Sequence, residues 1–294
     1  MSNDIKGLTM TIVFQAESAN YGESVGNVAS LKKITRDQGD QYSYISRQAL
    51  RYNIVEQLGE QEAAVSAEGS GEKKVIQFKA DATIDKYPEI DFFGYLKTEK
   101  GDSGKKRSAK VRLSNAISLE PFKGDLDFLT NKGLADRLNE NMNIAQAEIH
   151  KSYYRYTVVV DLDQIGIDIQ KDETIQIENS EKARRVKKLL DTISMLYRDI
   201  RARREDLKPL FVVGGVYDIK NPVFQNVVTV KDNCIVVDEI KSALYDSIKD
   251  DTYAGIVDNR FDNTNEVKSE LNATSVPEFF STLKKKVDDY YDGN

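Results

Sequence analysis

The chain has 294 residues, of which 40% are hydrophobic and 31% are charged, a composition typical of a folded protein in water. One cysteine, Cys234, excludes an internal disulfide framework and a multi-cysteine zinc site, and one histidine, His150, argues against a Ser-His-Asp triad or a His-rich metal site. No apolar run approaches the roughly 20 residues of a membrane span, and residues 1–10 lack the pattern of a secretory signal. We therefore expect a cytosolic protein that uses no cofactor and no metal ion.

The net charge of −6 hides an uneven distribution of charge along the chain. Residues 97–112 contain seven basic and two acidic side chains, and residues 182–208 contain ten basic and four acidic ones. Residues 238–294 contain thirteen acidic and seven basic ones. Two interpretations are open: an anion-binding surface with an acidic surface elsewhere, or charge runs that are ordinary solvated faces.

The first predicted elements are a strand and a helix. Residues 8–16 are dense in β-branched and apolar side chains and predict a strand. A polar loop follows at 17–23, and a second loop at 36–40 leads into a helix from about residue 46 to 58. Glycine, serine and lysine are frequent at the edges of residues 60–117, which we interpret as an insertion.

The second half of the chain alternates between strands and helices. The expected elements are a strand at 153–162, an amphipathic helix from about 180 to 204, a strand at 210–213 that ends at Gly214-Gly215, a strand at 234–237, and helices near 239–249 and 277–291. This order predicts an α+β fold, with helices on one face of a mostly antiparallel sheet. The ferredoxin-like RNA-recognition fold is the first candidate in this class.

The start of the helix at 46–58 carries the most informative pattern. On a helix, four of its positions form one stripe: Arg47, Arg51, Ile54 and Leu58. Two guanidinium groups thus occupy a stripe that a structural helix would fill with apolar residues, near a helix start that disfavours cations. A bound phosphate would relieve both problems, with Ser46 and Gln48 adding hydrogen bonds. The alternative is that both arginines pair with carboxylates at the edge of the core.

Several segments resemble a known family. Residues 46–52, Ser-Arg-Gln-Ala-Leu-Arg-Tyr, follow a first strand and loop that end in Phe-Gln-Ala-Glu-Ser-Ala-Asn at 14–20, and they resemble the DevR branch of the CRISPR-associated backbone proteins, the "Cas seven" subunits of type I-B Cascade. The resemblance continues in the expected order through 91–96, 111–121, 148–157 and 209–215.

The resemblance implies a modified RNA-recognition-motif palm with an inserted finger and a thumb. On this chain the palm is expected at 1–59 and 118–260, the finger at 60–117, the thumb hairpin at 216–235 within the palm span, and a C-terminal helical segment at 261–294. The implied function is a non-catalytic subunit that polymerises along the CRISPR RNA and presents its spacer to target DNA in antiviral defence. The implied partners are further copies of the chain and the 5′-handle-capping, large and small subunits of Cascade, in the prokaryotic cytoplasm and without a membrane.

The resemblance and the charge pattern together give a set of residues expected to contact RNA. These are Asn20, Tyr21, Ser46, Arg47, Gln48, Arg51, Lys105, Lys106, Arg107, Arg112, Gly214, Gly215 and Phe224. The loop after the first strand and the helix start would grip phosphates, and the basic edge of the finger would face the RNA. The two glycines would let the main chain approach the RNA closely. Phe224 would either wedge between bases at the thumb tip or lie buried at a hairpin base.

The alternative function is that of a metal-dependent, RNA-cleaving backbone subunit. Related backbone subunits of type III complexes cut target RNA with a loop aspartate and a divalent metal ion, and Asp37 and Asp40 lie in the corresponding loop. We interpret His150 and the pair Asp161 and Asp163 as structural. The basic run at 182–208 is discounted as an RNA site, because its arginines would complement the dipole at a helix end.

Overall fold

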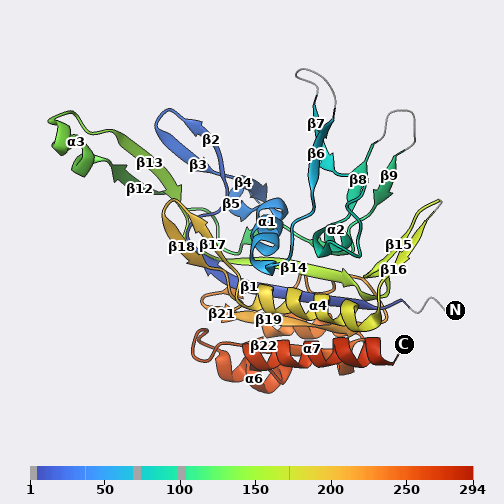
Figure 1. Ribbon diagram of the computed structural model, residues 1–294. Helices are drawn as coiled ribbons and strands as arrows, with labels where there is room; N and C mark the ends of the chain where they lie inside the picture. The colour runs from blue at the N-terminus through green and yellow to red at the C-terminus, as the bar shows by residue number, and fades with distance from the viewer. Residues whose placement is uncertain (1–4, 37, 69–73, 99–103, 172, 294) are drawn as a thin grey trace.

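The computed structural model describes residues 5–36, 38–68, 74–98, 104–171 and 173–293, which form one broad sheet with helices packed on both faces and hairpins that project from it (Figure 1). Within these residues the sheet has nine strands, in the order β23 (Thr274–Ser275), β22 (Thr252–Ile256), β19 (Phe211–Tyr217), β1 (Gly7–Ala16), β14 (Ser152–Asp161), β11 (Ala116–Ser118), β5 (Asp40–Ile45) and β4 (Lys33–Arg36), with β10 (Val111–Leu113) also paired to β14. The predicted α+β class is confirmed. No helix of the described ranges is long and apolar enough to cross a membrane.

Strand β1 is the centre of the sheet. It pairs antiparallel with β14 from Gly7 opposite Asp161 to Ala16 opposite Ser152, and antiparallel with β19 on its other side. A strand with neighbours on both sides and layers on both faces is apolar almost throughout, which is why the sequence predicts β1 and β14 well.

The three longest helices cover one face of the sheet. These are α1 (Arg47–Leu58), α4 (Asn179–Ser194) and α7 (Val276–Asp292). Their apolar stripes form a single core with alternate residues of β1 and β14, and it includes Leu50, Ile54, Leu189, Phe279 and Leu283. Within the C-terminal helical segment expected at 261–294, α7 is therefore part of the main core.

A second core lies on the other face, over β19 and β22. It contains Val13, Tyr153 and Phe211 from the sheet and a covering segment between β19 and β22. That segment includes β20 (Val230–Lys231), β21 (Cys234–Ile235), α5 (Val237–Ser242) and the 3₁₀ turn η2 (Lys249–Asp251), and α6 (Thr264–Leu271) packs nearby. The structure does not support a projecting thumb at 216–235, because Phe224 and Val228 are fully buried in this core.

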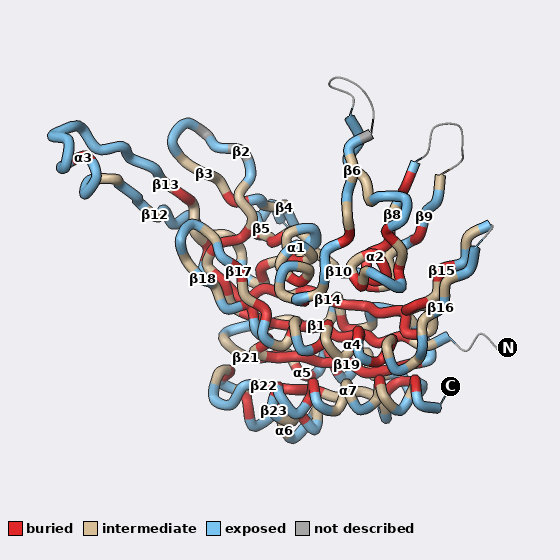
Figure 2. Tube along the Cα trace, in the orientation of Figure 1, coloured by how far each residue is buried: buried red, intermediate tan, exposed pale blue. Residues whose placement is uncertain are grey.

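Several hairpins project from the sheet, and most of their length is exposed (Figure 2). They are β2 (Tyr21–Val25) with β3 (Val28–Leu31), β6 (Val65–Glu68) with β7 (Val75–Phe78), β8 (Tyr95–Lys97) with β9 (Lys105–Arg107), β12 (Asp125–Thr130) with α3 (Lys132–Leu138) and β13 (Ile144–Ile149), β15 (Ile167–Ile169) with β16 (Thr174–Gln176), and β17 (Tyr197–Ile200) with β18 (Arg203–Asp206). The short helix α2 (Pro88–Phe93) lies between the second and third of these, and the 3₁₀ turn η1 (Leu162–Gln164) follows β14.

Two predicted boundaries are wrong. The insertion expected at 60–117 ends near residue 110, since β10 and β11 pair with β14 and belong to the main sheet. The helix expected at 180–204 ends at Ser194, and the chain continues as the β17–β18 hairpin. The turn of this hairpin is Arg201-Ala202, with φ of 48° and 60°, so these arginines do not lie at a helix end.

Candidate nucleic-acid interface

The start of α1 is tied to two neighbouring loops. Ser46 caps the helix, because its Oγ accepts a hydrogen bond from the Ala49 N–H at 3.2 Å. Asn20, in the loop after β1, donates from Nδ2 to the same Oγ at 3.2 Å. The N–H of Arg47 donates to Oδ1 of Asn115, between β10 and β11, at 2.9 Å. The first turn is thereby held in a fixed position at the edge of the sheet.

A groove of about 540 Å³ runs along this helix start. Its lining residues are Arg47, Gln48, Arg51, Phe93, Ala109, Val111, Arg112 and Leu113. Four of them come from the predicted RNA-binding set, and they bring three guanidinium groups and an amide to an apolar floor. This combination suits a chain of phosphates with attached rings.

Arg51 and Arg47 have different surroundings. The Arg51 guanidinium lies 4.9 Å from the centroid of the Phe93 ring and 3.9 Å from Glu89, the outer limit of an ion pair. Burial lowers the pKa of Arg51 below its usual value, against the opposing effect of Glu89. Arg47 is exposed, and no described carboxylate lies within 4 Å of its side chain.

The stripe expected on this helix is therefore only partly correct. Leu50, Ile54 and Leu58 fill the core, whereas Arg47 lies beyond the edge of the core where the helix begins. Because Arg47 is exposed to water, its position on the helix does not by itself require a bound anion. The groove that Arg47 and Arg51 share with Arg112 is what favours an anion at this helix start.

Arg112 links the groove to the sheet. Its Nη1 donates to Oδ1 of the buried Asp161 at 2.8 Å, and about half of its side chain stays exposed. Asp163, the other member of the predicted carboxylate pair, bonds to Lys220. Both aspartates thus have structural partners.

The basic edge of the insertion divides into exposed and buried residues. Lys105 and Lys106 are exposed on β9, and Lys105 lies 3.5 Å from Glu173. Arg107 is buried, and its Nη2 donates to Oδ1 of Asp91 at 2.6 Å. Sequence reasoning placed Arg107 against RNA, and its burial contradicts that prediction.

The predictions for Gly214, Gly215 and Phe224 also need correction. Both glycines lie buried in β19, where a Cβ would meet the Thr9 carbonyl oxygen at 2.1 Å and the Asp251 carbonyl oxygen at 2.0 Å. Close packing within the protein explains both glycines. Phe224 is fully buried in the second core, which is the alternative that the sequence left open.

Tyr21 contacts Arg201, a residue that the sequence analysis did not predict as part of the site. Its hydroxyl donates to the Glu148 carbonyl oxygen at 3.2 Å, and the Arg201 guanidinium lies 4.1 Å from its ring centroid. Arg201 is exposed at the tip of the β17–β18 hairpin. The β17–β18 hairpin brings Arg201 to Tyr21. The sequence analysis missed this contact because it expected a continuous helix through residue 204.

The residues of the second hypothesis have no metal-binding geometry in the described part of the chain. Asp40 is exposed at the start of β5, and Asp37 lies outside the described residues. No group of three or more His, Cys, Asp or Glu side chains there is arranged to hold a metal ion. His150 is buried with Nδ1 2.8 Å from the Ser43 hydroxyl, and burial lowers its pKa, which agrees with a structural role.

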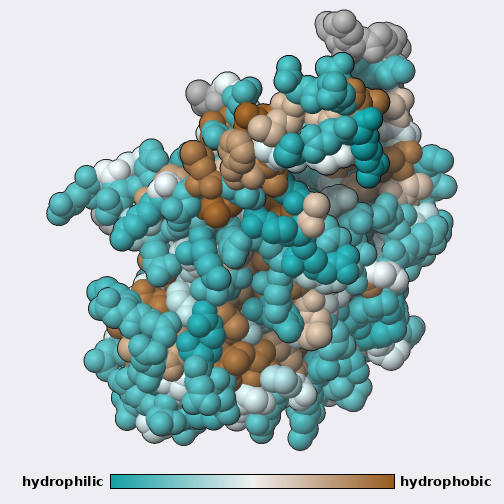
Figure 3. Space-filling model, turned by 90° about the vertical axis from the view of Figure 1, so that its left-hand side faces the viewer, coloured by the Kyte–Doolittle hydropathy of each residue, from teal (hydrophilic) through white to brown (hydrophobic). Residues whose placement is uncertain are grey.

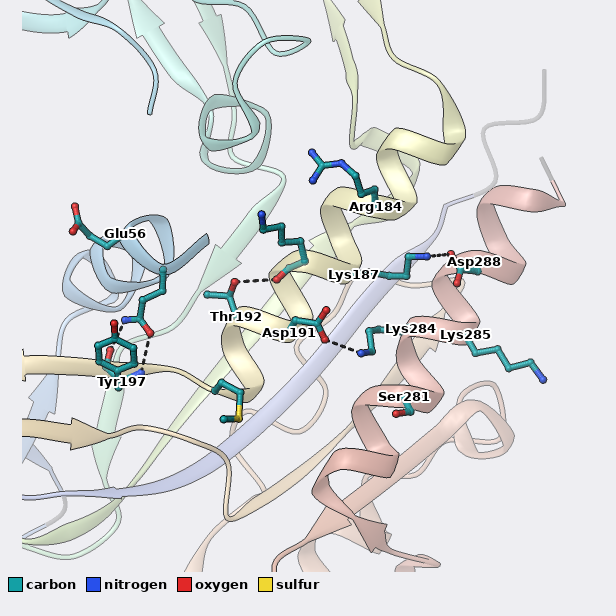
Figure 4. Close-up of a pocket in the computed structure, with 13 residues that line it drawn as sticks. Glu56, Arg184, Lys187, Asp191, Thr192, Tyr197, Ser281, Lys284, Lys285 and Asp288 are labelled. Carbon is teal, nitrogen blue, oxygen red and sulfur yellow. Dashed lines mark hydrogen bonds and ion pairs between the residues drawn. The ribbon is translucent and has the colours of Figure 1, made fainter. Parts of the chain in front are cut away.

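A hollow larger than the groove at α1 lies elsewhere on the described surface. It has a volume of about 1140 Å³ and lies mainly between α4 and α7 (Figure 4). Its charged side chains largely pair with each other: Lys187 with Asp288 and Lys284 with Asp191, both at 2.7 Å. Because these pairs neutralise one another, this hollow attracts a polyanion less than the groove at α1 does.

Comparison with known proteins supports the resemblance. The family described as CRISPR-associated negative auto-regulator DevR/Csa2 matches residues 8–238. A relative from Myxococcus xanthus (strain DK1622), the CRISPR-associated protein Cas7/Cst2/DevR, is 28% identical over 158 residues, 48% of this chain and 52% of the relative. The match thus spans about half the length of this curated relative.

Two solved structures share the fold. A chain of a "CRISPR RNA-guided surveillance complex, pre-nicking" has a TM-score of 0.56 and 12% sequence identity to this chain, and the match covers 100% of that chain and 96% of this one. A chain of a "CRISPR RNA-guided surveillance complex" gives 0.54 at 14% identity, over 99% of that chain and 95% of this one. At these identities the likeness concerns the fold alone, and the family match covers most of the sequence. The chain belongs to the DevR/Csa2 family of CRISPR-associated proteins.

Proposed function

We propose that this protein is a non-catalytic backbone subunit of a type I-B CRISPR surveillance complex. It binds the CRISPR RNA, polymerises along it with further copies, and presents the spacer to target DNA beside the other Cascade subunits. The observation that carries the proposal is the groove at the start of α1, where Arg47, Gln48, Arg51 and Arg112 meet.

The strand order supports an RNA-recognition palm. Along the chain, β1, α1, the β10–β11 pair, β14, α4 and β19 follow one another, and in the sheet the strand order is β19, β1, β14 and then β10 with β11. All these pairings are antiparallel. This βαββαβ order with the first and third strands central is that of the ferredoxin-like fold. The remaining strands extend the palm at both edges.

In this proposal the finger is the insertion from about 60 to 110, and the thumb moves to the β12–α3–β13 arm, residues 125–149. The arm is inserted between the second and third palm strands and projects away from the sheet (Figure 1). It exposes seven large apolar side chains: Leu126, Phe128, Leu129, Leu134, Leu138, Met142 and Ile144. Hydrophobic patches also interrupt the polar surface on the side toward which it projects (Figure 3). An arm that docks on the next copy gives a head-to-tail contact that repeats along an RNA.

The groove is suited to contact without sequence preference. Guanidinium groups bind phosphates, and the Phe93 ring with its apolar neighbours accepts any ring that packs on it. Spacers differ in sequence, so base pairing by the guide carries the specificity and the protein needs only the backbone.

The test is the double substitution of Arg47 and Arg51 by Ala, measured by fluorescence anisotropy with two RNAs of equal length and different sequence. We expect weaker binding of both RNAs, and a fall of about 1.4 in the steepness of the salt dependence for two lost phosphate contacts. The control replaces Arg184 and Lys188 of α4 by Ala, an equal loss of charge near the hollow of Figure 4. If the groove variant matches the wild type at two salt concentrations, the proposed site is wrong.

The non-catalytic part of the proposal has a separate test. The assembled complex is incubated with complementary RNA and Mg²⁺, and the RNA is resolved on a sequencing gel. We expect uncut RNA. Regularly spaced cuts that disappear in Asp37→Ala or Asp40→Ala would establish the metal-dependent nuclease instead.

A further inference from the structure

The sheet face opposite α1 carries an arginine without a carboxylate partner. Arg155 lies on β14 directly between Val13 of β1 and Ile117 of β11. Its Nη1 donates to the Val228 carbonyl oxygen at 2.6 Å. Among the described residues, no acidic side chain lies within 4 Å of its guanidinium, although the position is half-buried.

The register extends this row across the sheet toward its free edge. Ile117 pairs with Tyr44 of β5, so Val13, Arg155, Ile117 and Tyr44 share one face. Tyr42 lies two residues before Tyr44 and therefore on the same face. Tyr154, by contrast, faces the helices, as its hydroxyl contact with Ser43 at 2.7 Å confirms.

Arg36 completes this surface at the edge strand. It pairs with Asp40 in the β4–β5 register, on the same face as Tyr42, and its guanidinium lies 5.1 Å from the Tyr42 ring centroid. It is exposed. Arg36, Tyr42, Tyr44 and Arg155 thus form one strip, which we call the edge strip.

The covering segment of the second core ends at the edge strip. It reaches β14 at Val228, which accepts the hydrogen bond from Arg155, and the second core contains none of the strip residues. Tyr42, Tyr44 and Ile117 remain partly exposed beyond it. The strip therefore lies on the half of this face that borders solvent.

The charges of the edge strip favour an anion. Burial and the like charge of Arg36 lower the pKa of Arg155 to about 10, while Glu239 acts in the opposite direction. Both effects destabilise the guanidinium cation in the free protein, and the opposite charge of a phosphate near the two arginines would offset them. Tyrosine rings on a sheet face are, in addition, platforms on which bases stack.

We propose that the edge strip, Arg36, Tyr42, Tyr44 and Arg155, is a second binding surface for single-stranded nucleic acid, on the sheet face opposite the groove at α1. Phosphates lie against the two arginines, and bases stack on the tyrosines. The surface is separate from the guide-binding groove and does not depend on it. An acidic peptide would use the arginines but gain little from the rings, which is why we assign nucleic acid.

The test uses protein in which Arg47 and Arg51 are already Ala, so that the edge strip is measured alone. A labelled 12-nucleotide oligothymidylate is titrated against this protein and against the same protein with Arg36→Gln or Tyr44→Leu. We expect each added substitution to weaken binding about fivefold or more. Tyr245→Leu, at an exposed tyrosine far along the chain in the acidic region, is the matched control and should leave binding unchanged.

Two further measurements locate the ligand and guard against misfolding. Ultraviolet crosslinking and mass spectrometry should place the oligonucleotide on the peptide that holds Tyr42 and Tyr44. Arg36 is exposed, so Arg36→Gln should keep the wild-type melting curve even where an Arg155→Gln variant does not.

Three results would overturn the edge strip: no oligothymidylate binding in the Arg47→Ala, Arg51→Ala background, equal affinity in the strip variants, or crosslinks only outside β4 and β5. Polyglutamate binding that depends on Arg36 but not on Tyr44 would reassign the surface to acidic protein. Failure of the α1 groove is seen separately, as unchanged guide binding in the Arg47→Ala, Arg51→Ala protein.

Discussion

Asp91 is a fully buried carboxylate that holds two arginines at once. Arg107 donates to its Oδ1 at 2.6 Å, Arg185 donates to its Oδ2 at 3.1 Å, and the N–H of Gly166 completes its hydrogen bonds. Other donors of the two arginines meet the carbonyl oxygens of Ile84, Asp85, Gln164 and Ile167. Nε of Arg185 donates to Oε1 of Glu181 at 2.7 Å. This cluster joins α2 and β9 of the insertion to α4, which packs on the main sheet, so it fixes how the insertion is placed.

Replacement of Asp91 by Ala should destabilise the fold by about 3–5 kcal/mol, because the buried Arg107 loses its carboxylate partner and Arg185 keeps only Glu181. The measurement is urea unfolding followed by circular dichroism. Asp199→Ala removes the partner of Arg204 at an exposed ion pair and should leave the transition midpoint unchanged. A midpoint for Asp91→Ala that coincides with that of Asp199→Ala would show that the cluster contributes little.

Of the residues in this cluster, the sequence analysis singled out only Arg107, and it assigned Arg107 to the wrong environment. Arg107 belongs to a basic run and was interpreted as exposed, as its neighbours Lys105 and Lys106 are. Charge runs show composition, whereas burial depends on a partner distant in sequence, here Asp91 at the end of another element. The helix-start residues were located correctly because capping by Ser46 is a local interaction.

At the scale of elements, hydrophobic periodicity predicted a strand or helix correctly where the periodic pattern ended together with the element. The strand at 8–16 and the helix at 46–58 were predicted to within about a residue. The helix at 180–204 was extended too far, because Leu196 and Tyr197 continue the helical spacing by position while they lie in a turn and a strand. The turn itself uses Arg201 and Ala202 in place of the usual glycine or asparagine, so no turn signal marks it.

That turn predicts a stabilising substitution. Ala202 has a φ of 60°, a conformation that costs an alanine about 1 kcal/mol and a glycine almost nothing. Ala202→Gly should raise the free energy of unfolding by about 0.5–1 kcal/mol, measured by urea titration. Ala49→Gly in α1 is the opposite case and should lower it by about 1 kcal/mol. If Ala202→Gly lowers the free energy of unfolding as much as Ala49→Gly does, the left-handed conformation of Ala202 is wrong.

The β12–α3–β13 arm makes a prediction about assembly. Its apolar side chains are exposed in the single chain, so Leu134→Ser with Leu138→Ser should leave the melting temperature unchanged. If the arm docks on the next copy, as proposed, the same change should abolish the stepwise growth of complexes on a long RNA, measured by analytical ultracentrifugation. Ile169→Ser, at an equally exposed position on β15, is the control and should assemble normally. Normal assembly of the double variant would remove the arm from the interface.

For the whole molecule, the main core extends beyond the residues that match the family. The match ends at residue 238, yet α7 at 276–292 packs on α4 and on the sheet. Its charged side chains also form ion pairs with α4 and η2, as Lys284 does with Asp191 and Lys286 with Asp251. The acidic C-terminal region, which the sequence presented as a separate surface, is therefore also one side of the main core.

A chain that ends at Ser275 should fail to fold. Such a chain lacks Val276 and five further side chains that are buried more deeply in the main core: Phe279, Phe280, Leu283, Val287 and Tyr291. At about 1.5–3 kcal/mol for each buried large apolar side chain, their loss removes roughly 7–15 kcal/mol, which is comparable to the whole stability of an ordinary domain. The measurement is soluble yield and a cooperative thermal transition by circular dichroism, with a chain that ends at Asp292 as the control. A truncated protein that melts cooperatively and still binds RNA would mean that the sheet and the groove at α1 stand without α7, because the rest of the helical layer suffices to cover that face.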